Sequence, residues 1–567
     1  MSTKTVASES VAESYLSLLR ERGVERLFVN AGTDFPSVVE AYGRQKDSKL
    51  ELPEPTVCAH ENLAVGMAHG AYLAGGRPQA VMLHVSVGTA NAICGIINAT
   101  RDRVPVFLTA GRTPLFEEGA FGSRSGSIHW AQEMFDQAGM LRELVKWDYE
   151  LRDGLQIEAV VDRAVGMAMS EPRGPIYLTL PREVLARRME GFSYRDQPLA
   201  LPAPPSPDPE AVGELADLLA RAQFPVIAAS AAGRDPRAVA LLSDLSRRFA
   251  IGVVENLPRT MNLPGDHPLH LGYRLGPVLP VADVVCFVEC DVPWIPAMES
   301  PREETVLVHA GVDPLFSRYP IRSHRANLAI QSSPRNLLEA LGAALEERSI
   351  DPGRYERVAA LAAENRARQQ QAVEADARAG GSEITRTYLN WALAEVRPKD
   401  AVVVNEYWAQ APLLASTEPG TYFGTPPAGG LGWGLPAALG VQLEQPDRTV
   451  IATVGDGSYL FANPAACHHA AAMHDLPVLT IVHTNAKWAA VEGAARGMYP
   501  QGHAMEEERI PLSRLDPVPA FERYAEASGG FGALVTERAE LVPTLRKALD
   551  VVRTEHRQAV VNVISPA

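Results

Sequence analysis

Short apolar segments alternate with amphipathic segments along most of the chain. Near its start, Val11, Tyr15, Leu18 and Leu19 recur at the spacing of one helix face. Further on, residues 79–85 form a short and mostly apolar run, and the Ser-Val-Gly-Thr-Ala segment after it is expected to be a loop. Apolar runs of this length between helices are typical of parallel strands buried on both faces. The pattern therefore predicts an α/β protein.

Two interruptions divide this alternation into three parts. Residues 197–209 contain six prolines, a composition that suits an extended linker. A charged helical stretch at 355–379 separates the second part from the third. No short-period repeat is visible, so what recurs is the architecture. We predict three doubly wound parallel-sheet α/β domains, at 1–190, 210–345 and 380–567.

Composition narrows the class of protein further. The chain has 567 residues and a formal net charge of −15, so nucleic acid is not expected as a partner. Its five cysteines are scattered and form no Cys-x-x-Cys pair, which argues against a zinc site or a disulfide framework. No apolar run reaches the roughly 20 residues that span a bilayer, and the N-terminus lacks an apolar signal core. We therefore expect a cytoplasmic enzyme that acts on small molecules and contacts no membrane.

The main candidate chemistry lies in the last third of the chain. An apolar segment at 449–454 leads directly into Gly455-Asp456-Gly457-Ser458, where a helix is expected to begin and to run to about residue 473. Glycines let the backbone approach a ligand closely, and free amides at a helix start suit a phosphate. A second apolar segment at 477–483 ends at Thr484-Asn485. Both predicted strands would end at one edge of a parallel sheet, where ligands usually bind.

Asp456 and Asn485 are therefore expected to converge. Their carboxylate and amide oxygens, with the backbone carbonyl of Lys487, would form an oxygen site of the kind that suits Mg²⁺. Gly-Asp-Gly alone most often marks a turn, and Asn485 alone is compatible with a capping role. The strand before the motif, the helix after it and the second strand ending in Asn together favour a metal and phosphate site.

This arrangement resembles the thiamine-diphosphate motif, Gly-Asp-Gly followed at similar distance by Asn-Asn, with Thr484 in place of the first Asn. The likeness extends over nearly the whole chain to the pyruvate oxidase/acetolactate synthase superfamily, and its motifs are closest to those of benzoylformate decarboxylases. The resemblance implies a pyrimidine-binding domain, a central domain and a diphosphate-binding domain. It also implies that thiamine diphosphate and Mg²⁺ are held at Asp456, Gly457, Ser458 and Asn485.

Glu61, in Ala-His-Glu-Asn before a predicted helix at 62–74, stands where the family has a catalytic glutamate. The resemblance implies that its carboxyl group shares a proton with the pyrimidine ring, which is general acid–base catalysis carried out through the cofactor. The alternative is an acidic residue favoured by the helix macrodipole.

A glycine-rich segment, Ala-Gly-Gly-Leu-Gly-Trp at 428–433, is the second matching motif. By resemblance, the Gly429 carbonyl accepts from the amino group of the pyrimidine, and Leu431 holds the cofactor bent. The segment is not a Gly-x-Gly-x-x-Gly fingerprint, so NAD is not supported. A plain helix entry is the alternative.

His84 stands where benzoylformate decarboxylases carry a histidine, and acetolactate synthases generally do not. Gln132 falls close to a glutamine that acetolactate synthases and benzaldehyde lyase place near the cofactor. Thr33 takes the place of a substrate-binding serine. Structural roles remain open for all three: a hydrogen-bonded histidine, a surface glutamine and a turn or capping threonine.

Departures from benzoylformate decarboxylases leave the substrate open. No second histidine occurs around Val292-Pro-Trp294, and Trp488 and Val491 replace expected side chains of the substrate pocket. Trp488 is also compatible with a core role. His468-His469 in the third domain is expected to pack within its helix.

Three functions follow from these residues. The first is non-oxidative decarboxylation of a 2-oxoacid, favoured by His84. The second is an acetolactate-synthase-like carboligase that joins a 2-oxoacid or aldehyde to form a 2-hydroxyketone, favoured by Gln132. The third is a non-catalytic binding protein, which the presence of Glu61, Asp456 and Asn485 disfavours. The resemblance implies a homodimer at least, with homotetramers common. No feature of the sequence demands FAD or a nucleotide in the central domain, and neither is predicted.

Overall fold

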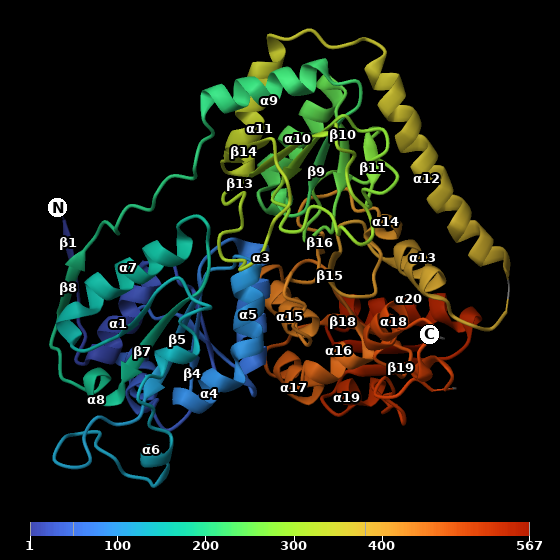
Figure 1. The fold of residues 1–567 in the computed structure, drawn as a ribbon. Helices are drawn as coiled ribbons and strands as arrows, with labels where there is room; N and C mark the ends of the chain where they lie inside the picture. The colour runs from blue at the N-terminus through green and yellow to red at the C-terminus, as the bar shows by residue number, and fades with distance from the viewer. Residues whose placement is uncertain (1, 49, 380, 508, 566–567) are drawn as a thin grey trace.

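The computed structural model describes residues 2–48, 50–379, 381–507 and 509–565. Its main architecture is three six-stranded sheets in which all neighbouring strands run parallel. Separate apolar cores lie on the two faces of each sheet, as the sequence pattern predicts for doubly wound domains. The prediction of three α/β domains is confirmed, whereas their limits at 1–190, 210–345 and 380–567 stay a prediction. Figure 1 shows the central domain above the other two.

The N-terminal sheet has the strand order β3-β2-β4-β5-β7-β6. Its strands are β2 (Arg26–Val29), β3 (Glu54–Val57), β4 (Gln79–Leu83), β5 (Val106–Arg112), β6 (Asp148–Glu150) and β7 (Ile176–Pro181). Its helices are α1 (Val11–Glu21), α2 (Pro36–Ser48), α3 (Glu61–Gly75), α4 (Val85–Asn91), α5 (Ile93–Arg101), α6 (Ile128–Ala131), α7 (Ile157–Met169) and α8 (Arg182–Leu185). Strands β1 (Thr3–Val6) and β8 (Phe192–Arg195) form a separate antiparallel pair at its margin.

The C-terminal sheet has the order β16-β15-β17-β18-β20-β19. Its strands are β15 (Val402–Glu406), β16 (Tyr422–Phe423), β17 (Val450–Gly455), β18 (Val478–Thr484), β19 (Phe531–Val535) and β20 (Ala559–Ile564). Its helices are α13 (Arg386–Val396), α14 (Ala411–Leu414), α15 (Gly434–Glu444), α16 (Asp456–Phe461), α17 (Pro464–Met473), α18 (Ala489–Met498), α19 (Glu522–Glu526) and α20 (Arg538–Thr554). When the strands of each sheet are numbered along the chain, both this sheet and the N-terminal one have the order 2-1-3-4-6-5.

The central sheet differs, with the order β11-β10-β9-β12-β13-β14, or 3-2-1-4-5-6 along the chain. Its strands are β9 (Pro225–Ala229), β10 (Gly252–Glu255), β11 (His270–Gly272), β12 (Val284–Val288), β13 (Val306–Gly311) and β14 (Leu328–Gln331). Its helices are α9 (Pro209–Arg221), α10 (Pro236–Phe249), α11 (Pro334–Glu346) and the long α12 (Arg354–Ala379), which descends to the C-terminal domain in Figure 1.

Helices α3 and α15 hold the N- and C-terminal domains together. Each follows the second strand of its sheet, and one apolar core contains buried residues of both domains. Their backbones approach closely at Gly70, where an added Cβ would lie 1.9 Å from the Ala437 carbonyl oxygen, and at Gly440, where it would lie 1.9 Å from that of Met67. Glycine at these positions permits a contact that any side chain would obstruct.

Two local predictions were wrong. Residues 86–90 are helical within α4 and not a loop, since this segment buries Ser86, Gly88 and Thr89 against the domain. The helix expected from Ser458 to about residue 473 is divided into α16 and α17, because Asn463 adopts a left-handed conformation before Pro464. No helix in the described part of the chain combines the length and hydropathy needed to cross a membrane.

Candidate functional site

The predicted diphosphate segment lies at the carboxyl ends of β17 and β18, which are neighbours in the sheet. Asp456 is buried, and its carboxylate accepts from three backbone amides: Gly457 (2.8 Å), Asn485 (3.1 Å) and Ala486 (2.7 Å). These bonds join the two strand ends, so the predicted convergence of Asp456 and Asn485 is observed. Burial raises the pKa of Asp456, and the three amides act in the opposite direction.

Oxygen atoms at this edge have the chemistry of a Mg²⁺ site. Asn485 Oδ1 accepts only from the Lys487 amide (3.1 Å), and no described residue donates to the Lys487 carbonyl. No group of three or more His, Cys, Asp or Glu side chains among the described residues could hold a metal ion. A cation here would therefore have one carboxylate, one amide oxygen and one carbonyl from the protein. This set fits Mg²⁺, which takes its remaining ligands from phosphate and water.

Trp488 packs against the start of α16, the helix proposed to contact the diphosphate. Its ring meets Phe461 edge-on with centroids 5.7 Å apart, and a Cβ at Gly457 would lie 2.2 Å from that ring. Trp488 therefore packs on the helix that follows the Gly-Asp-Gly turn. Val491, one turn into α18, is 48% exposed and free to meet a ligand or a second chain. Thr484 is buried and donates to Asn562 Oδ1 (2.7 Å), so it takes a structural role.

Glu406, at the end of β15, is a buried residue that the sequence patterns did not identify. Its carboxylate accepts from the amides of Gly432 (2.8 Å) and Gly434 (2.6 Å), and the Trp433 amide and Ser458 hydroxyl also stabilise its charged form. Burial outweighs these bonds and raises its pKa to about 7. Glu406 thus ties the glycine-rich segment to the start of α16.

The glycine-rich segment is fixed from both sides. Gly429 has a positive φ of 61°, and its carbonyl accepts from the Tyr407 hydroxyl (3.1 Å). The next residue, Gly430, pairs both its backbone groups with the amide side chain of Asn98 in α5 (2.9 and 3.0 Å). Leu431 is half-buried. Asn98 is another residue that sequence reasoning missed, because its contact spans 332 positions.

Glu61 begins α3 in the N-terminal domain. One carboxylate oxygen accepts from Asn91 Nδ2 (2.5 Å), and the side chain is half-buried. The other oxygen, Oε1, lies 3.5 Å from where a Cβ of Gly88 would be. Glu61 therefore faces α4 at the carboxyl edge of the sheet.

His84 follows β4 at the same edge and belongs to a polar cluster. Its Nδ1 lies 2.5 Å from Asp34 Oδ1, and its Nε2 lies 3.4 Å from Gln132 Nε2. Gln132 Oε1 is buried without a hydrogen-bond partner among the described residues. The hydrogen bond to Asp34 and the charges of Asp34 and Glu61 raise the pKa of His84, against the effect of burial. The predicted residues His84 and Gln132 are thus brought together, and Asp34 is a third member that the sequence did not reveal.

Two glycines leave room for this Asp–His pair. A Cβ at Gly32 would lie 2.1 Å from His84 Nδ1, and one at Gly111 would lie 1.9 Å from Asp34 Oδ2. Thr33, between Gly32 and Asp34, is exposed, and its carbonyl accepts from Arg182 (3.3 Å). Glycine at positions 32 and 111 is therefore required for the close approach of Asp34 and His84.

Another histidine contributes to the surroundings of His84, although it does not lie in the region around residues 292–294. His129, in α6, is buried, and its Nδ1 accepts from the Ser125 amide (3.1 Å). Burial and the charges of Arg182, Arg124 and His84 lower the pKa of His129. His468 packs within the C-terminal domain as predicted, 2.6 Å from the Tyr459 hydroxyl, whereas His469 is exposed, because it lies on the exposed face of α17, so the prediction was wrong for that residue.

The two groups of predicted residues stay separate within one chain. No hydrogen bond or ion pair of the described residues joins Glu61, His84 or Gln132 to Asp456 or Asn485. Figure 1 shows α4 on one side of the α3–α15 contact, and α16 and α18 on the other.

Comparisons with known proteins agree with this geometry. The model for the thiamine pyrophosphate enzyme N-terminal TPP binding domain matches residues 9–140, and that for the C-terminal TPP binding domain matches residues 404–563. Together these matches span more than half of the chain. The chain belongs to the thiamine pyrophosphate enzymes, and its outer domains are TPP-binding domains.

Relatives within this family differ in activity. Benzoylformate decarboxylase of Pseudomonas aeruginosa is 28% identical, over 96% of this chain and 97% of its own. A probable acetolactate synthase of Mycobacterium bovis is 26% identical, over 100% and 98%. The crystal structure of benzoylformate decarboxylase from Polynucleobacter necessarius superposes with a TM-score of 0.78 at 19% identity, covering 99% of both chains, which supports the fold.

Proposed function

We propose that this enzyme is a thiamine-diphosphate- and Mg²⁺-dependent decarboxylase of a 2-oxoacid, similar to benzoylformate decarboxylase. The observation that best supports this proposal is the position of His84. Its Nδ1 lies 2.5 Å from Asp34 Oδ1, at the same sheet edge as Glu61. Such a histidine is a proton donor that a decarboxylase needs when it releases an aldehyde.

The cofactor would be held mainly by the C-terminal domain. Asp456, Asn485 and the Lys487 carbonyl would bind Mg²⁺, and Gly457 and Ser458 at the start of α16 would contact the diphosphate. The Gly429 carbonyl and Leu431 would contact the pyrimidine and hold the bent conformation. When bound, thiamine diphosphate supplies the nucleophilic carbon and the electron sink that decarboxylation of a 2-oxoacid requires.

The N-terminal residues would move protons. Glu61 would exchange a proton with the pyrimidine nitrogen, and Asn91 orients its carboxylate through the 2.5 Å bond. His84 would donate a proton to the product carbon from Nε2, because Asp34 occupies Nδ1. Thr33, Trp488 and Val491 would line the substrate pocket, and the Val491 side chain is 48% exposed.

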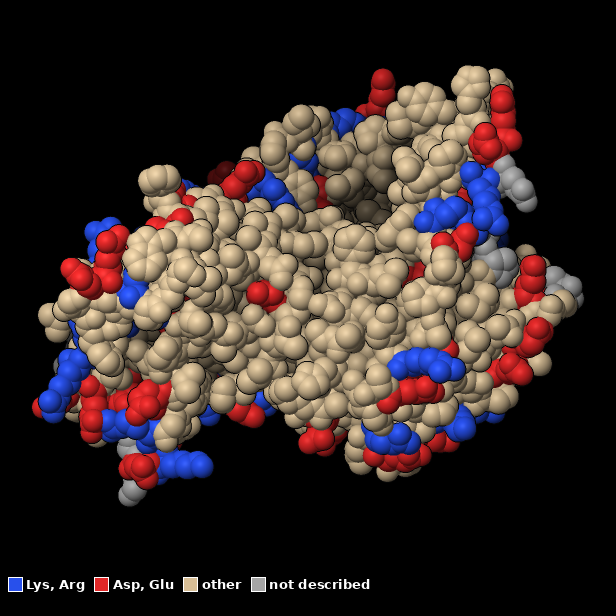
Figure 2. Space-filling view, turned by 90° about the horizontal axis from the view of Figure 1, so that it is seen from below, with Lys and Arg blue, Asp and Glu red and all other residues tan. Residues whose placement is uncertain are grey.

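A second chain would complete each site. We propose a homodimer at least, in which Glu61 and His84 of one chain face the Asp456 segment of another. Figure 2 shows a broad face with few Lys, Arg, Asp or Glu side chains in its middle, as a buried subunit contact requires. Exposed apolar side chains near the two half-sites, Phe121 and Phe135 around α6 and Met498 at the end of α18, support such a contact.

Gln132 favours a second candidate, an acetolactate-synthase-like carboligase. Its side-chain Nε2 lies 3.4 Å from His84 Nε2, where it would donate to the carbonyl oxygen of a second substrate. Such a carboligase would join the decarboxylated 2-oxoacid to an aldehyde or ketone and release a 2-hydroxyketone, and the cofactor would supply the nucleophilic carbon. Proton donation by His84 would compete with this reaction, because it leads to release of an aldehyde.

Product analysis distinguishes the two. The protein, loaded with thiamine diphosphate and MgCl₂, is incubated separately with benzoylformate and with pyruvate, and the products are separated by chromatography. Free benzaldehyde or acetaldehyde as the main product supports the decarboxylase. Acyloin or acetolactate without free aldehyde overturns it in favour of the carboligase. His84→Ala should then reduce aldehyde release, whereas Gln132→Ala should reduce any carboligation.

A further inference from the structure

A hollow lies between the N-terminal and central domains, away from the candidate site. It opens to solvent, and its empty volume, open part included, is about 600 Å³. Five basic residues line it: Arg101, Arg103, Lys146, Arg173 and Arg318. A gathering of cations in a hollow contrasts with the net charge of −15 on the whole chain.

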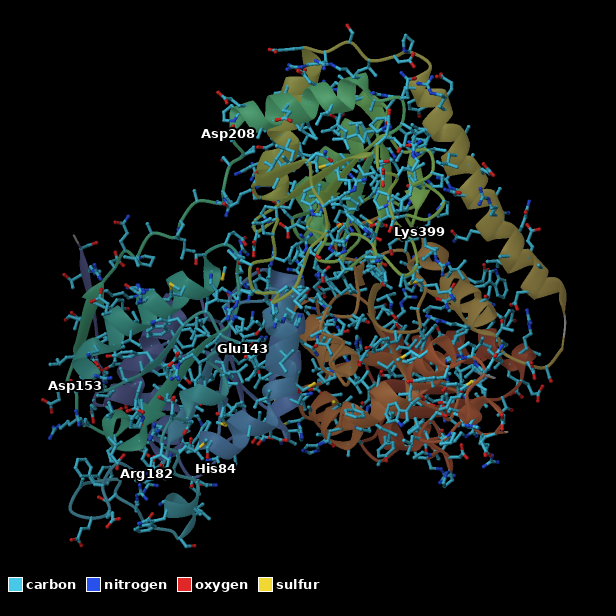
Figure 3. The ribbon with its side chains drawn as sticks, viewed as in Figure 1. His84, Glu143, Asp153, Arg182, Asp208 and Lys399 are labelled. Atoms are coloured by element: carbon cyan, nitrogen blue, oxygen red, sulfur yellow. The ribbon has the colours of Figure 1, made fainter. Side chains whose placement is uncertain are left out.

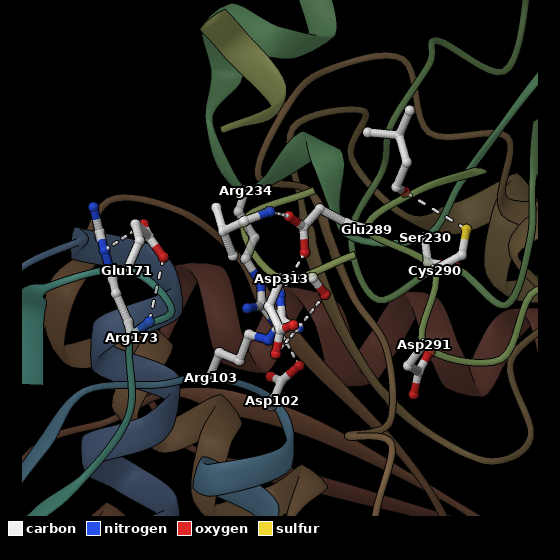
Figure 4. Close-up of polar contacts among 12 residues, drawn as sticks. Asp102, Arg103, Glu171, Arg173, Ser230, Arg234, Glu289, Cys290, Asp291 and Asp313 are labelled. Carbon is white, nitrogen blue, oxygen red and sulfur yellow. Dashed lines mark hydrogen bonds and ion pairs between the residues drawn. The ribbon is translucent and has the colours of Figure 1, made fainter. Parts of the chain in front are cut away.

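Carboxylates neutralise only two of these cations. Arg103 pairs with Glu289 (2.8 Å) and lies 3.8 Å from Asp313, and Arg173 pairs with Glu171 (3.0 Å), as Figure 4 shows. These two pairs fix the walls of the hollow. Their charges are balanced within the protein.

The other three cations form no ion pair with any described carboxylate. Arg101 donates to the Arg318 carbonyl (2.6 Å), and Arg318 donates to the carbonyls of Glu143 (2.5 Å) and Val145 (3.2 Å). Lys146 donates to the carbonyl (2.6 Å) and hydroxyl (2.9 Å) of Ser170. Carbonyls position these three groups but do not neutralise them. The five cations and the three carboxylates Glu171, Glu289 and Asp313 leave an excess of two positive charges around the hollow.

Lys146 has a lowered pKa. Burial is the main cause and brings its pKa to about 8; Glu171 acts in the opposite direction, and the charges of Arg318 and Arg173 lower the pKa further. An anion in the hollow would reverse this effect, because it favours the protonated amine. Binding of an anion should therefore weaken as the pH rises above about 8.

The position in the fold separates this hollow from the chemistry. Its N-terminal residues precede β5, β6 and β7, at the amino edge of a sheet whose carboxyl edge bears His84. Glu143, next to the hollow, and His84 lie well apart in Figure 3. On the other side, Asp313–Tyr319 follow β13, at the carboxyl edge of the central sheet, where open α/β sheets usually bind ligands.

We propose that this hollow is a binding site for a small organic phosphate, distinct from the thiamine diphosphate site. The phosphate would be bound by Arg101, Lys146 and Arg318, since Arg and Lys are the usual contacts of a doubly charged oxyanion. Its carbon part would lie on the apolar wall formed by Phe316, Tyr319 and Pro172. The site does not depend on which reaction the enzyme catalyses.

Phenyl phosphate is a suitable probe, with benzoate as a singly charged control and phenol as a neutral one. Titration calorimetry on the protein saturated with thiamine diphosphate and Mg²⁺ should detect phenyl phosphate, with benzoate weaker and phenol undetected. Affinity should fall about tenfold in Lys146→Met, the loss expected for one charge-assisted hydrogen bond. It should also fall between pH 7 and pH 9. Equal affinity for phenyl phosphate and phenol overturns the proposal.

Chemical labelling then locates the probe. Lys146, with its low pKa, should react readily in reductive methylation, and phenyl phosphate should slow its reaction severalfold without changing that of the exposed Lys399. Unchanged labelling of Lys146 at saturating probe overturns the assignment, even where calorimetry detects binding. Because neither readout uses turnover, a failure here leaves the proposed decarboxylase untouched, and the reverse also holds.

Discussion

The N- and C-terminal domains have one topology and carry different chemistry at the same edge. Both sheets follow the order 2-1-3-4-6-5, and in both a packing helix, α3 or α15, follows the second strand. After the third strand, the C-terminal domain has Asp456 and the N-terminal domain has His84. Equivalent positions thus carry the proposed metal and phosphate site in one domain and the proposed proton donor in the other.

The two strand ends differ in how many backbone amides donate to the carboxylate that lies there. In the C-terminal domain, the amides of residues 457, 485 and 486 donate to the Asp456 carboxylate and hold it in the place proposed for a cation ligand. In the N-terminal domain, Asp34 contacts the His84 side chain at 2.5 Å, accepts from one backbone amide, that of Val85, at 3.4 Å, and raises the pKa of His84. A shared fold fixes where a site lies, and a few side chains decide its chemistry.

The comparison predicts that Glu61→Ala impairs catalysis and leaves cofactor binding nearly unchanged. We expect turnover and proton exchange at the thiazolium carbon to fall about 10³-fold, within the range for loss of a general acid–base group. Cofactor affinity should stay within a few-fold, because the C-terminal domain provides the metal and phosphate contacts. Exchange is measured by NMR and affinity by calorimetry, with the exposed Glu303→Ala as control. A large loss of affinity in Glu61→Ala would contradict this division of labour.

The converse substitution, Asp456→Asn, should impair binding. The Asn side chain keeps one acceptor oxygen for the neighbouring backbone amides but lacks the negative charge proposed to bind Mg²⁺. We therefore expect the MgCl₂ concentration at half-maximal activity to rise at least about 100-fold, above the usual range for residues that only support a metal ligand. The apoprotein should unfold at nearly the same denaturant concentration as the parent. Titration of activity with MgCl₂ at saturating thiamine diphosphate gives the result. An unchanged midpoint would place the metal elsewhere.

Sequence reasoning worked where function depends on a motif next to a predictable strand. Gly455–Ser458 and Asn485 each follow an apolar strand, so their convergence followed from the rule that parallel strands end at one edge. Glu61 and His84 were identified by resemblance to family motifs, and the structure places both at the carboxyl edge of the N-terminal sheet. The class of fold followed from the alternation of apolar runs and helices, which needs no knowledge of tertiary contacts.

The missed residues depend on contacts between distant segments. Asp34 meets His84 across 50 positions, and Asn98 meets Gly430 across 332. Glu406 becomes a capping acceptor only when β15 lies beside β17 and the glycine-rich segment folds over it. Spacing in the sequence carries no sign of such pairs, because they are set by packing between elements.

Gly70→Ala tests the contact that holds the two domains together. Alanine normally stabilises a helix by about 1 kcal/mol relative to glycine. Here its Cβ would lie 1.9 Å from the Ala437 carbonyl oxygen, so we expect a net loss of about 2 kcal/mol in the free energy of unfolding, typical of overpacking. Gly213→Ala in α9 is the matched control, since its Cβ would meet nothing within 4 Å and should stabilise. Denaturant unfolding measures both, and equal shifts would contradict the close approach of α3 and α15.

Asp34→Asn should change the pH dependence more than the maximal rate. Asp34 raises the pKa of His84, so protonated His84 persists to higher pH in the parent. In the variant the alkaline fall in aldehyde release should move to lower pH, so the variant should be slower than the parent at pH values between the two transitions. The same bond stabilises the fold below the unfolded histidine pKa of about 6.5, and this stabilisation is lost as the pH rises through the raised pKa. The unfolding free energy of parent and variant should therefore converge at alkaline pH. An unshifted rate profile together with a stability difference that persists at high pH would assign Asp34 a purely structural role.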